Sequence, residues 1–521
     1  MQKSKEPNMP VSRTKRTLQN SKVSLILFVI QILIGFYSRK IFLEYLGDEV
    51  LGLNTTLGNI LSFLNLSELG IGIAMATSLY KPIHDDNHEA IAEIISVQGI
   101  LYKRIAWILC CLSIPILFAI PYIFPSTECS LLYIYVSYIV FFSGSIFSYL
   151  WNYRQILIQA DQKGFKLQPW IHATRYAKIV LQIVLLIYTP LGIWSWISVE
   201  FAGNIANVFV VNHVIHKEYP WLQKSKKSEF VLLHEYKSLL SKVKQLFAHK
   251  IGAYVLHQTS PLVIYAFVSL TMVTHYSNYM MLIGYCQTLM NVIFGGMGAS
   301  IGNLIADNNK QHTMNVFSEL FTSRIWIAGI ACFVVYISIR PFITLWIGNK
   351  YVLDETTLLL LLLSMFIQIS RTVIESFKDA YQLFADVWAP IIEACLNLGC
   401  SILFGYLWGL NGILMGVNLS LIFIVLLWKP YYTFRYGLRS SVMNYYLQYA
   451  LHVIILFGGA IVTKIVLKII NYQEDNILSI SLSIISGSLI YIIITFVLLS
   501  LCTKGMRMFA IRIQKILTHR L

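Results

Sequence analysis

Long apolar stretches recur from one end of the chain to the other, and they constrain its fold more than any other feature. A helix that crosses the hydrocarbon core of a bilayer needs about 20 apolar residues, and about fourteen windows of the sequence meet this requirement. Because a lipid-exposed span must satisfy its own backbone hydrogen bonds, the pattern predicts an all-α polytopic membrane protein. The predicted spans are 23–42, 50–80, 92–123, 130–157, 168–188, 193–214, 250–273, 279–305, 317–343, 357–384, 388–407, 411–432, 446–470 and 477–502.

The composition agrees with a membrane location and excludes most soluble classes. Hydrophobic residues make up 57% of the 521 residues and charged residues only 12%, whereas a soluble protein carries about 25% charged residues. A soluble multidomain enzyme is therefore excluded. The sequence also lacks the motifs GxxxxGK(S/T) and HExxH, so we expect no bound nucleotide, no catalytic metal and no other cofactor.

The positive charge is unevenly distributed along the sequence. The net charge is +15, from 40 Lys and Arg against 25 Asp and Glu. With the N-terminus placed in the cytoplasm, most of the basic residues fall on the inner side of the predicted spans. The distribution therefore predicts cytoplasmic N- and C-termini and an even number of spans. Because orientation in the membrane explains the excess of basic residues, we expect no nucleic acid as a partner.

A polar segment divides the predicted spans into two groups. The predicted organisation is a basic N-terminus at 1–22, a six-helix bundle at 23–214, a cytoplasmic linker at 215–249, a second six-helix bundle at 250–440, two additional transmembrane helices at 441–502 and a basic cytoplasmic tail at 503–521. The linker contains the amphipathic run VLLHEYKSLLSKVKQLF. We expect this run to form a helix on the inner membrane surface, with Lys237, Lys242 and Lys244 facing anionic lipid.

The two groups of spans resemble each other in sequence. The matches are Trp170 with Trp388 and Asp161 with Asp379 at an offset of 218, Arg154 within one residue of Arg371, and Pro190–Ile193 with Leu410–Ile413 at an offset of 220. Repeats in the same orientation predict a pseudo-twofold axis along the membrane normal. They also predict a cavity between the halves and alternating access by rocking of one half against the other.

Two segments carry a resemblance to a known family. The segment RKIFLEYLGDEVLGLNTTLGNILSFLNLSELGIGIAMATSLYKPI at 39–83 and the segment YRQILIQADQKGF at 153–165 resemble Wzx-type polysaccharide flippases. These belong to the MOP superfamily, which is MATE-like. The resemblance covers most of the chain and implies the MATE-like MOP fold of two six-helix bundles plus two C-terminal helices. It implies an inner-membrane flippase for undecaprenyl-pyrophosphate-linked oligosaccharide, the repeat unit of O-antigen, capsule or exopolysaccharide.

Cations within the predicted spans suit such a cargo, because the guanidinium group of arginine binds two phosphate oxygens at once. The candidate substrate-binding residues are Arg39, Arg154, Arg175, Lys178 and Arg371. For Arg39, the alternative is an interfacial anchor that extends to the headgroups. Arg371 is only an inner-end charge if its span ends near residue 370, and Arg154 is close to an inner end as well. Arg175 and Lys178 are at (i, i+3), so they share one helix face.

Carboxylates in the predicted spans are candidates for coupling transport to H+ or Na+. The candidates are Glu68, Glu200, Glu375 and Glu393. Glu375 follows Arg371 by four residues, so an internal ion pair is the alternative for these two. Pro261 is a candidate hinge in the predicted seventh span because proline frees a backbone carbonyl, and a simple kink is the alternative.

Two other functions remain open. The first is a MATE-like small-molecule exporter with the same fold, which would favour an acidic cavity. The second is a membrane glycosyltransferase or O-antigen polymerase, which the short predicted outer loops and the internal repeat disfavour. For a flippase, the expected partners are the lipid-linked oligosaccharide, membrane lipids and possible polysaccharide polymerase machinery. We expect a monomer, since one chain holds both halves. We also expect that the protein is not an enzyme.

Overall fold

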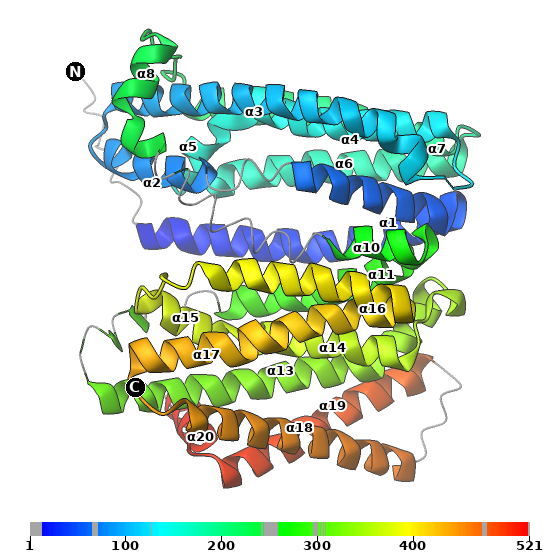
Figure 1. Ribbon diagram of the computed structural model, residues 1–521, viewed down its shortest axis with the longest axis vertical. Coiled ribbons are helices and arrows are strands. Elements are labelled where there is room, and N and C mark those ends of the chain that lie inside the picture. The colour runs from blue at the N-terminus through cyan, green and yellow to red at the C-terminus, as the bar shows by residue number, and fades with distance from the viewer. Residues whose placement is uncertain are drawn as a thin grey trace, which may run out of the picture. The chain divides into compact units, whose positions relative to one another are not determined.

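The chain folds as an assembly of helices. The structure, a computed structural model, describes residues 13–64, 71–125, 127–240, 243, 259–294, 301–302, 304–305, 307, 309–470 and 477–518. Every regular element within these ranges is helical (Figure 1). The chain divides into two compact units, Met1–Gln258 and Thr259–Leu521, and each contains an apolar core of its own.

Nine helices in the described ranges are long and apolar enough to cross a membrane. The prediction of an all-α polytopic membrane protein is therefore confirmed. Two of the nine contain a glycine that separates two predicted spans: Gly47 (φ 82°) lies within Leu25–Ser62, and Gly409 (φ 56°) lies within Trp388–Leu438. Glycine adopts a positive φ at little cost because it has no Cβ. The chain is thereby kinked between spans without a long loop.

The first unit contains the elements α1 to α8. Their bounds are α1 Arg13–Leu64, α2 Ile71–His84, α3 His88–Ile123, α4 Leu131–Trp151, the 3-10 helix η2 Asn152–Arg154, α5 Gln155–Ala160, α6 Gly164–Tyr188, α7 Ile193–Glu218 and α8 Glu229–Glu235. Helix α6 packs against α1 and α7, and α4 packs against α3 and α7 (Figure 1). The largest apolar core of this unit joins α2, α3, α5, α7 and α8, so it lies at the end that carries the linker.

The linker docks on α3 through polar contacts. Lys227 Nζ lies 2.8 Å from Glu93 Oε1 and 2.7 Å from Glu235 Oε2. Tyr236 donates a hydrogen bond to Glu93 Oε2 at 2.9 Å, and its burial, together with the Glu93 carboxylate, raises the pKa of Tyr236 to about 12. The expected continuous amphipathic helix is thus interrupted at Tyr236, because this stretch binds α3, and Lys237 follows the interruption. The other two lysines expected to face lipid lie outside the described residues: Lys242 and Lys244.

The second unit contains the remaining helices. Their bounds are α10 Ser260–Phe267, α11 Leu270–Phe294, α13 Lys310–Trp346, the 3-10 helix η3 Asn349–Tyr351, α14 Glu355–Ser370, α15 Thr372–Ala380, α16 Trp388–Ser420, the π-helix η4 Leu421–Trp428, α17 Lys429–Tyr432, the π-helix η5 Thr433–Leu438, α18 Val442–Ile470, α19 Ile477–Cys502 and α20 Lys504–Leu517. Helix α13 packs against α14, α18, α19 and α20, while α16 packs against α10 and α14. The predicted basic tail therefore includes a helix that is docked on α13, where Arg512 Nε lies 2.8 Å from Glu319 Oε1.

Matching backbone features support the internal repeat and correct its alignment. Gly192 (φ 50°, ψ −124°) precedes α7, and Gly409 (φ 56°, ψ −134°) has nearly the same conformation within α16. Gln162 (φ 56°) and Gln382 (φ 55°) follow the short helices α5 and α15. The sequence match pairs Gly192 with Gly412, but these two glycines have different backbone conformations. Gly412 is helical and has no room for a side chain beside the Phe404 carbonyl, so only Gly409 has the conformation that needs glycine.

The predicted seventh and eighth spans, 250–273 and 279–305, have a different boundary in the structure. Helix α10 ends at Phe267 and α11 begins at Leu270, so the break falls inside the predicted seventh span. The Ser269 hydroxyl accepts a hydrogen bond from the N–H of Met272 at 3.1 Å and thereby caps α11. The gap that the two predicted spans left at 274–278 lies within α11 and includes two of its buried positions, Thr274 and Asn278.

Candidate functional site

Arg154 and Arg371 occupy similar positions in the two units, where a long helix gives way to a short one. Arg371 (φ −63°, ψ −23°) joins α14 to α15, and Arg154 (φ −66°, ψ −16°) joins η2 to α5. Helix α14 ends at Ser370, but α15 continues the same apolar stretch to Ala380. Arg371 therefore lies within the Glu355–Ala380 stretch, roughly 24 Å from its start at 1.5 Å per residue.

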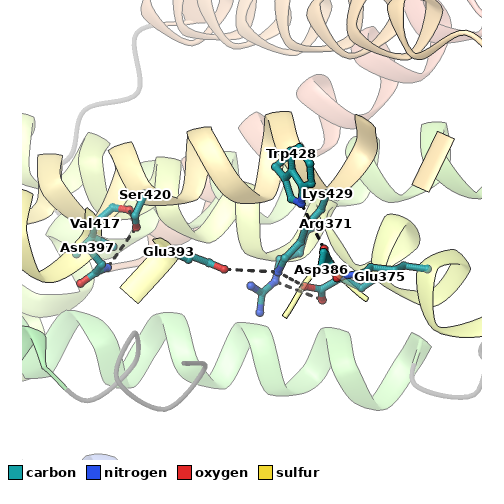
Figure 2. A network of polar contacts seen from close by, with 10 residues as sticks. Arg371, Glu375, Asp386, Glu393, Asn397, Val417, Ser420, Trp428 and Lys429 are labelled. Atoms are coloured by element: carbon teal, nitrogen blue, oxygen red, sulfur yellow. Dashed lines mark hydrogen bonds and ion pairs between the residues drawn. The ribbon is translucent and has the colours of Figure 1, made fainter. Parts of the chain in front are cut away.

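Arg371 belongs to a network of charged residues in the second unit (Figure 2). Its Nε lies 3.5 Å from Glu375 Oε2, which is the internal ion pair given as the alternative for these two residues. Glu375 Oε1 also accepts a hydrogen bond from Lys429 Nζ at 3.0 Å. Lys429 begins α17, between the two π-helices η4 and η5. Such segments recur at functional sites because they turn side chains away from the regular helical positions.

Glu393 is the most deeply buried carboxylate of this network. Its side chain on α16 is 2% exposed, and its Oε2 lies 3.7 Å from Lys429 Nζ. Its other oxygen, Oε1, is buried and has no hydrogen-bond partner among the described residues. One turn further on, Asn397 donates to the hydroxyl of Ser420 at 3.4 Å (Figure 2). A buried acceptor without a donor is costly, so Glu393 has the capacity to take up a proton or a cation.

A third carboxylate, Asp386, is held nearby by two donors. Lys378 Nζ lies 2.6 Å and 2.7 Å from its two oxygens. Trp428 Nε1 donates to Asp386 Oδ2 at 3.3 Å (Figure 2). The network thus contains equal numbers of cations and carboxylates. These are Arg371, Lys378 and Lys429 against Glu375, Asp386 and Glu393.

A polar cavity adjoins Arg371, and at this cavity the cations outnumber the carboxylates. Its volume is about 180 Å³, and its walls come from α11, α13, α14 and α15. Arg324 of α13, 4% exposed, lines it together with Arg371, so two guanidinium groups face one carboxylate, that of Glu375. The remaining polar lining residues are Gln287, Asn291, Gln368 and Thr372. This combination of guanidinium groups and hydrogen-bonding side chains is suited to an anionic, hydroxylated molecule.

The first unit pairs its span charges more simply. Lys178 Nζ lies 2.6 Å from Glu200 Oε1, and Gln182 donates to Glu200 Oε2 at 3.0 Å. The stem of Lys178 packs against Gly203, where the structure leaves no room for a Cβ. Both oxygens of Glu200 are therefore occupied. Arg175, although predicted to share a face with Lys178, is exposed on α6.

The structure places the other predicted site residues at separate positions. Arg154 lies beside Tyr153, with its guanidinium carbon 5.7 Å from the ring centre. Arg39 is half-buried on α1, eight residues before the kink at Gly47. Pro261 lies in the first turn of α10, where proline is well tolerated, and Glu68 lies outside the described residues.

Sequence reasoning did not single out four charged residues of this site: Arg324, Lys378, Asp386 and Lys429. Arg324 and Lys429 resemble the basic residues at the inner ends of spans, although each falls within a predicted span. The position of Arg324 within 317–343 and of Lys429 within 411–432 was the available signal. In the described part of the chain, no group of three or more His, Cys, Asp or Glu side chains is placed to hold a metal ion.

Comparison with solved structures identifies the class of fold. No protein-family model and no curated protein matches the sequence. The lipid II flippase MurJ, in an inward closed conformation, is similar at a TM-score of 0.64 and 14% identity, over 91% of this chain and 99% of MurJ. An inward-facing multidrug resistance MATE family transporter of the MOP superfamily is similar at a TM-score of 0.55 and 13% identity, over 80% of this chain and 99% of that one.

A MATE transporter of Vibrio cholerae gives a TM-score of 0.50 at 16% identity, over 82% of this chain and 98% of that one. The chain therefore has the fold that MurJ and the MATE transporters share, as its resemblance to flippases implied.

Proposed function

We propose that the chain is a flippase that moves an undecaprenyl-pyrophosphate-linked oligosaccharide across the bacterial inner membrane by alternating access, with both termini in the cytoplasm. The observation that carries this proposal is the polar cavity lined by Arg324 and Arg371 within an otherwise apolar set of helices. A pyrophosphate needs cationic donors, and the attached sugars need hydrogen-bonding groups such as Gln287 and Gln368. The proposed transporter performs no covalent chemistry.

A second cavity supports a lipid-linked cargo over a small soluble one. It has a volume of about 500 Å³ and lies between α13, α14, α18 and α19. Its walls are mainly apolar and include Phe333, Leu359, Leu363 and Phe457, with Lys464 among its polar members. A polyprenyl chain is apolar, so its contact with the apolar walls of this cavity is favourable. The helices α18 and α19 thus contribute a surface for the lipid tail.

The deciding experiment measures where lipid-linked repeat units accumulate. In a strain whose only flippase is this protein, its depletion should leave the units on the cytoplasmic face, and the wild-type gene should restore their export. Arg324→Ala and Arg371→Ala should fail to restore export although the proteins reach the membrane at wild-type levels. Arg104→Ala, which changes an exposed arginine paired with Glu229, is the matched control. Normal export after depletion would refute the flippase assignment.

The apolar cavity gives a separate test of the lipid tail. Ala460→Trp fills a cavity position with a large side chain and should slow transport of a long-chain polyprenyl substrate. Transport of a short-chain analogue in proteoliposomes should change much less, because its tail does not need that surface. Equal effects on both substrates would argue against the cavity as a tail site.

For the energy source, we propose that Glu393 binds the coupling H+ or Na+. Its buried and unpartnered Oε1 supports this assignment, while Glu200 and Glu375 already have two polar partners each. Glu393→Gln should abolish the dependence of transport on a proton or sodium gradient in proteoliposomes. Glu89→Gln, at an exposed position in the first turn of α3, serves as the control. A gradient dependence that survives Glu393→Gln would rule out this role.

A MATE-like exporter of small molecules is the second candidate, because the fold is shared with MATE transporters. The two proposals differ in the charge of the cargo. An exporter of cationic drugs should lose activity when the carboxylates Glu375 and Glu393 are neutralised, and should tolerate Arg324→Ala. Raised drug sensitivity of a deletion strain, with normal export of repeat units, would favour the exporter.

A further inference from the structure

Two cavities on the surface of the first unit adjoin the same part of α7. The larger has a volume of about 860 Å³, lies between α6 and α7, and is lined by Lys166, Trp170, Phe209, His213 and Lys217 among others. The smaller, of about 510 Å³, lies between α4 and α7 and is almost wholly apolar. Phe209 and His213 line both cavities, so these two side chains form a ridge between an almost wholly apolar groove and a larger groove with both charged and apolar walls.

The polar groups of this site gather at one end. Lys166, near the start of α6, is paired with Glu218 at the end of α7 at 2.6 Å. An ammonium group has three donors, so Lys166 retains donor capacity beyond its contacts with the two Glu218 oxygens at 2.6 Å and 2.8 Å. Lys217 is exposed beside this pair. The His213 ring can donate a hydrogen bond in either protonation state. The balance of charge at this end is therefore positive.

The apolar groups follow at a greater depth along the helices. Phe209 is 71% exposed although it belongs to an apolar helix, and it precedes Lys217 by eight residues, or roughly 12 Å at 1.5 Å per residue. Trp170 lies one turn of α6 beyond Lys166 and is 58% exposed, as is typical of tryptophan at the level of lipid headgroups. Phe147 and Trp151 of α4 line the smaller groove.

From this arrangement we infer that the start of α6 and the end of α7 together bind one anionic diacyl phospholipid. The Lys166, Lys217 and His213 side chains hold the anionic headgroup, and the two acyl chains lie in the two grooves on either side of Phe209. A cationic end and two grooves that each have apolar walls match one anionic headgroup with two chains, whereas a polyprenyl lipid has a single chain. The predicted orientation of the chain places this site in the cytoplasmic leaflet.

The test uses native mass spectrometry of the full-length protein in detergent, with phosphatidylglycerol as the probe. Phosphatidylglycerol should bind more tightly than zwitterionic phosphatidylethanolamine. Lys217→Gln should weaken its binding about fivefold, which corresponds to one lysine near an anionic lipid surface. Lys226→Gln, the same change at an exposed lysine of the linker, should leave binding unchanged. Phe209→Ala should weaken binding of both phospholipids, because it removes the ridge between the grooves.

Three results would overturn the proposal. They are equal affinity for the two phospholipids, unchanged phosphatidylglycerol binding in Lys217→Gln, and displacement of phosphatidylglycerol by equimolar undecaprenyl phosphate. The last result would show that the site prefers a single-chain lipid. Lys217 is exposed, so its substitution should not disturb folding, and the midpoint of thermal unfolding in detergent checks this. None of these measurements depends on transport.

Discussion

The two units bury their span charges in different ways. In the first unit, Lys178 and Glu200 form a compact pair whose remaining acceptor is filled by Gln182. In the second unit, Arg371 belongs to a network of charged groups that borders a polar cavity and contains the unpartnered oxygen of Glu393. A fully paired charge in a membrane protein stabilises the fold, whereas a partly paired one can change partners when a substrate or ion binds. The comparison therefore predicts a structural role for the first arrangement and a transport role for the second.

The backbone explains how similar helices give such different sites. Both units interrupt a long helix at an arginine and continue with a short helix, which is followed by a positive-φ glutamine. In the second unit, the π-helices η4 and η5 also flank Lys429 and direct it toward Glu375. The described part of the first unit contains no π-helix. The extra cation reaches the second network through this local change in helical geometry.

The largest expected effect is loss of transport on substitution of Arg371. Arg371→Ala should lower transport at least tenfold, because it removes the proposed charge-assisted contact with the anionic cargo from a side chain that is only 21% exposed. Arg371→Lys should restore only part of the activity, since lysine lacks the bidentate geometry. Transport in proteoliposomes at equal protein density measures both. Wild-type rates in Arg371→Ala would remove the distinction between the two units.

The second prediction concerns stability and the Lys178 pair. Lys178→Ala should lower the free energy of unfolding by about 2 kcal/mol, because Glu200 is left largely buried without its cation. The double variant Lys178→Met with Glu200→Gln should recover most of this loss and keep transport activity. Unfolding in detergent, followed by tryptophan fluorescence, gives the stability. If the double variant is stable but does not transport, the pair has a role beyond structure.

The third prediction uses the two glycines that give the units their common turn. Gly192→Ala and Gly409→Ala should each cost about 2 kcal/mol, because a Cβ is strained at these φ and ψ values. Gly399→Ala is the control, at a helical position with open space around it, and should be neutral or slightly stabilising. A cost at Gly192 but not at Gly409 would show that the turns are not equivalent.

The smallest effect is expected at Asp354, which caps α14 and so helps to position the helix that leads to Arg371. Burial opposes ionisation of its carboxyl, but hydrogen bonds from Thr357 and Asn411 hold its pKa below the usual value. Asp354→Ala should cost about 1 kcal/mol. The stability contributed by Asp354 is present above its unfolded-state pKa and lost as the pH falls through its lower folded-state pKa.

Stability of wild type and Asp354→Ala, measured between pH 7 and the acid limit of folding, checks this prediction. The difference between the two proteins should shrink as the pH falls below about 4. A difference that stays constant with pH would show that packing at Asp354, and not its charge, stabilises the cap.

The sequence by itself determined the class of the protein. Apolar windows fix the helical class because a bilayer offers the backbone no hydrogen-bond partners. The same windows marked Arg371, Glu375 and Glu393 as charges at costly positions. The sequence also located the two glycine-containing turns, but it paired Gly192 with Gly412, because short motifs do not reveal which glycine has a positive φ.

Only the tertiary structure decided how the marked charges combine. Glu375 and Lys429 are 54 positions apart, and their contact depends on how α15 packs against α17. It also decided that Lys178 is satisfied by Glu200, that Arg324 shares a cavity with Arg371, and that the linker docks on α3. The physical reason is that apolar periodicity fixes where a helix lies along the chain. Whether a buried charge is paired depends on the neighbouring helices, which no local pattern specifies.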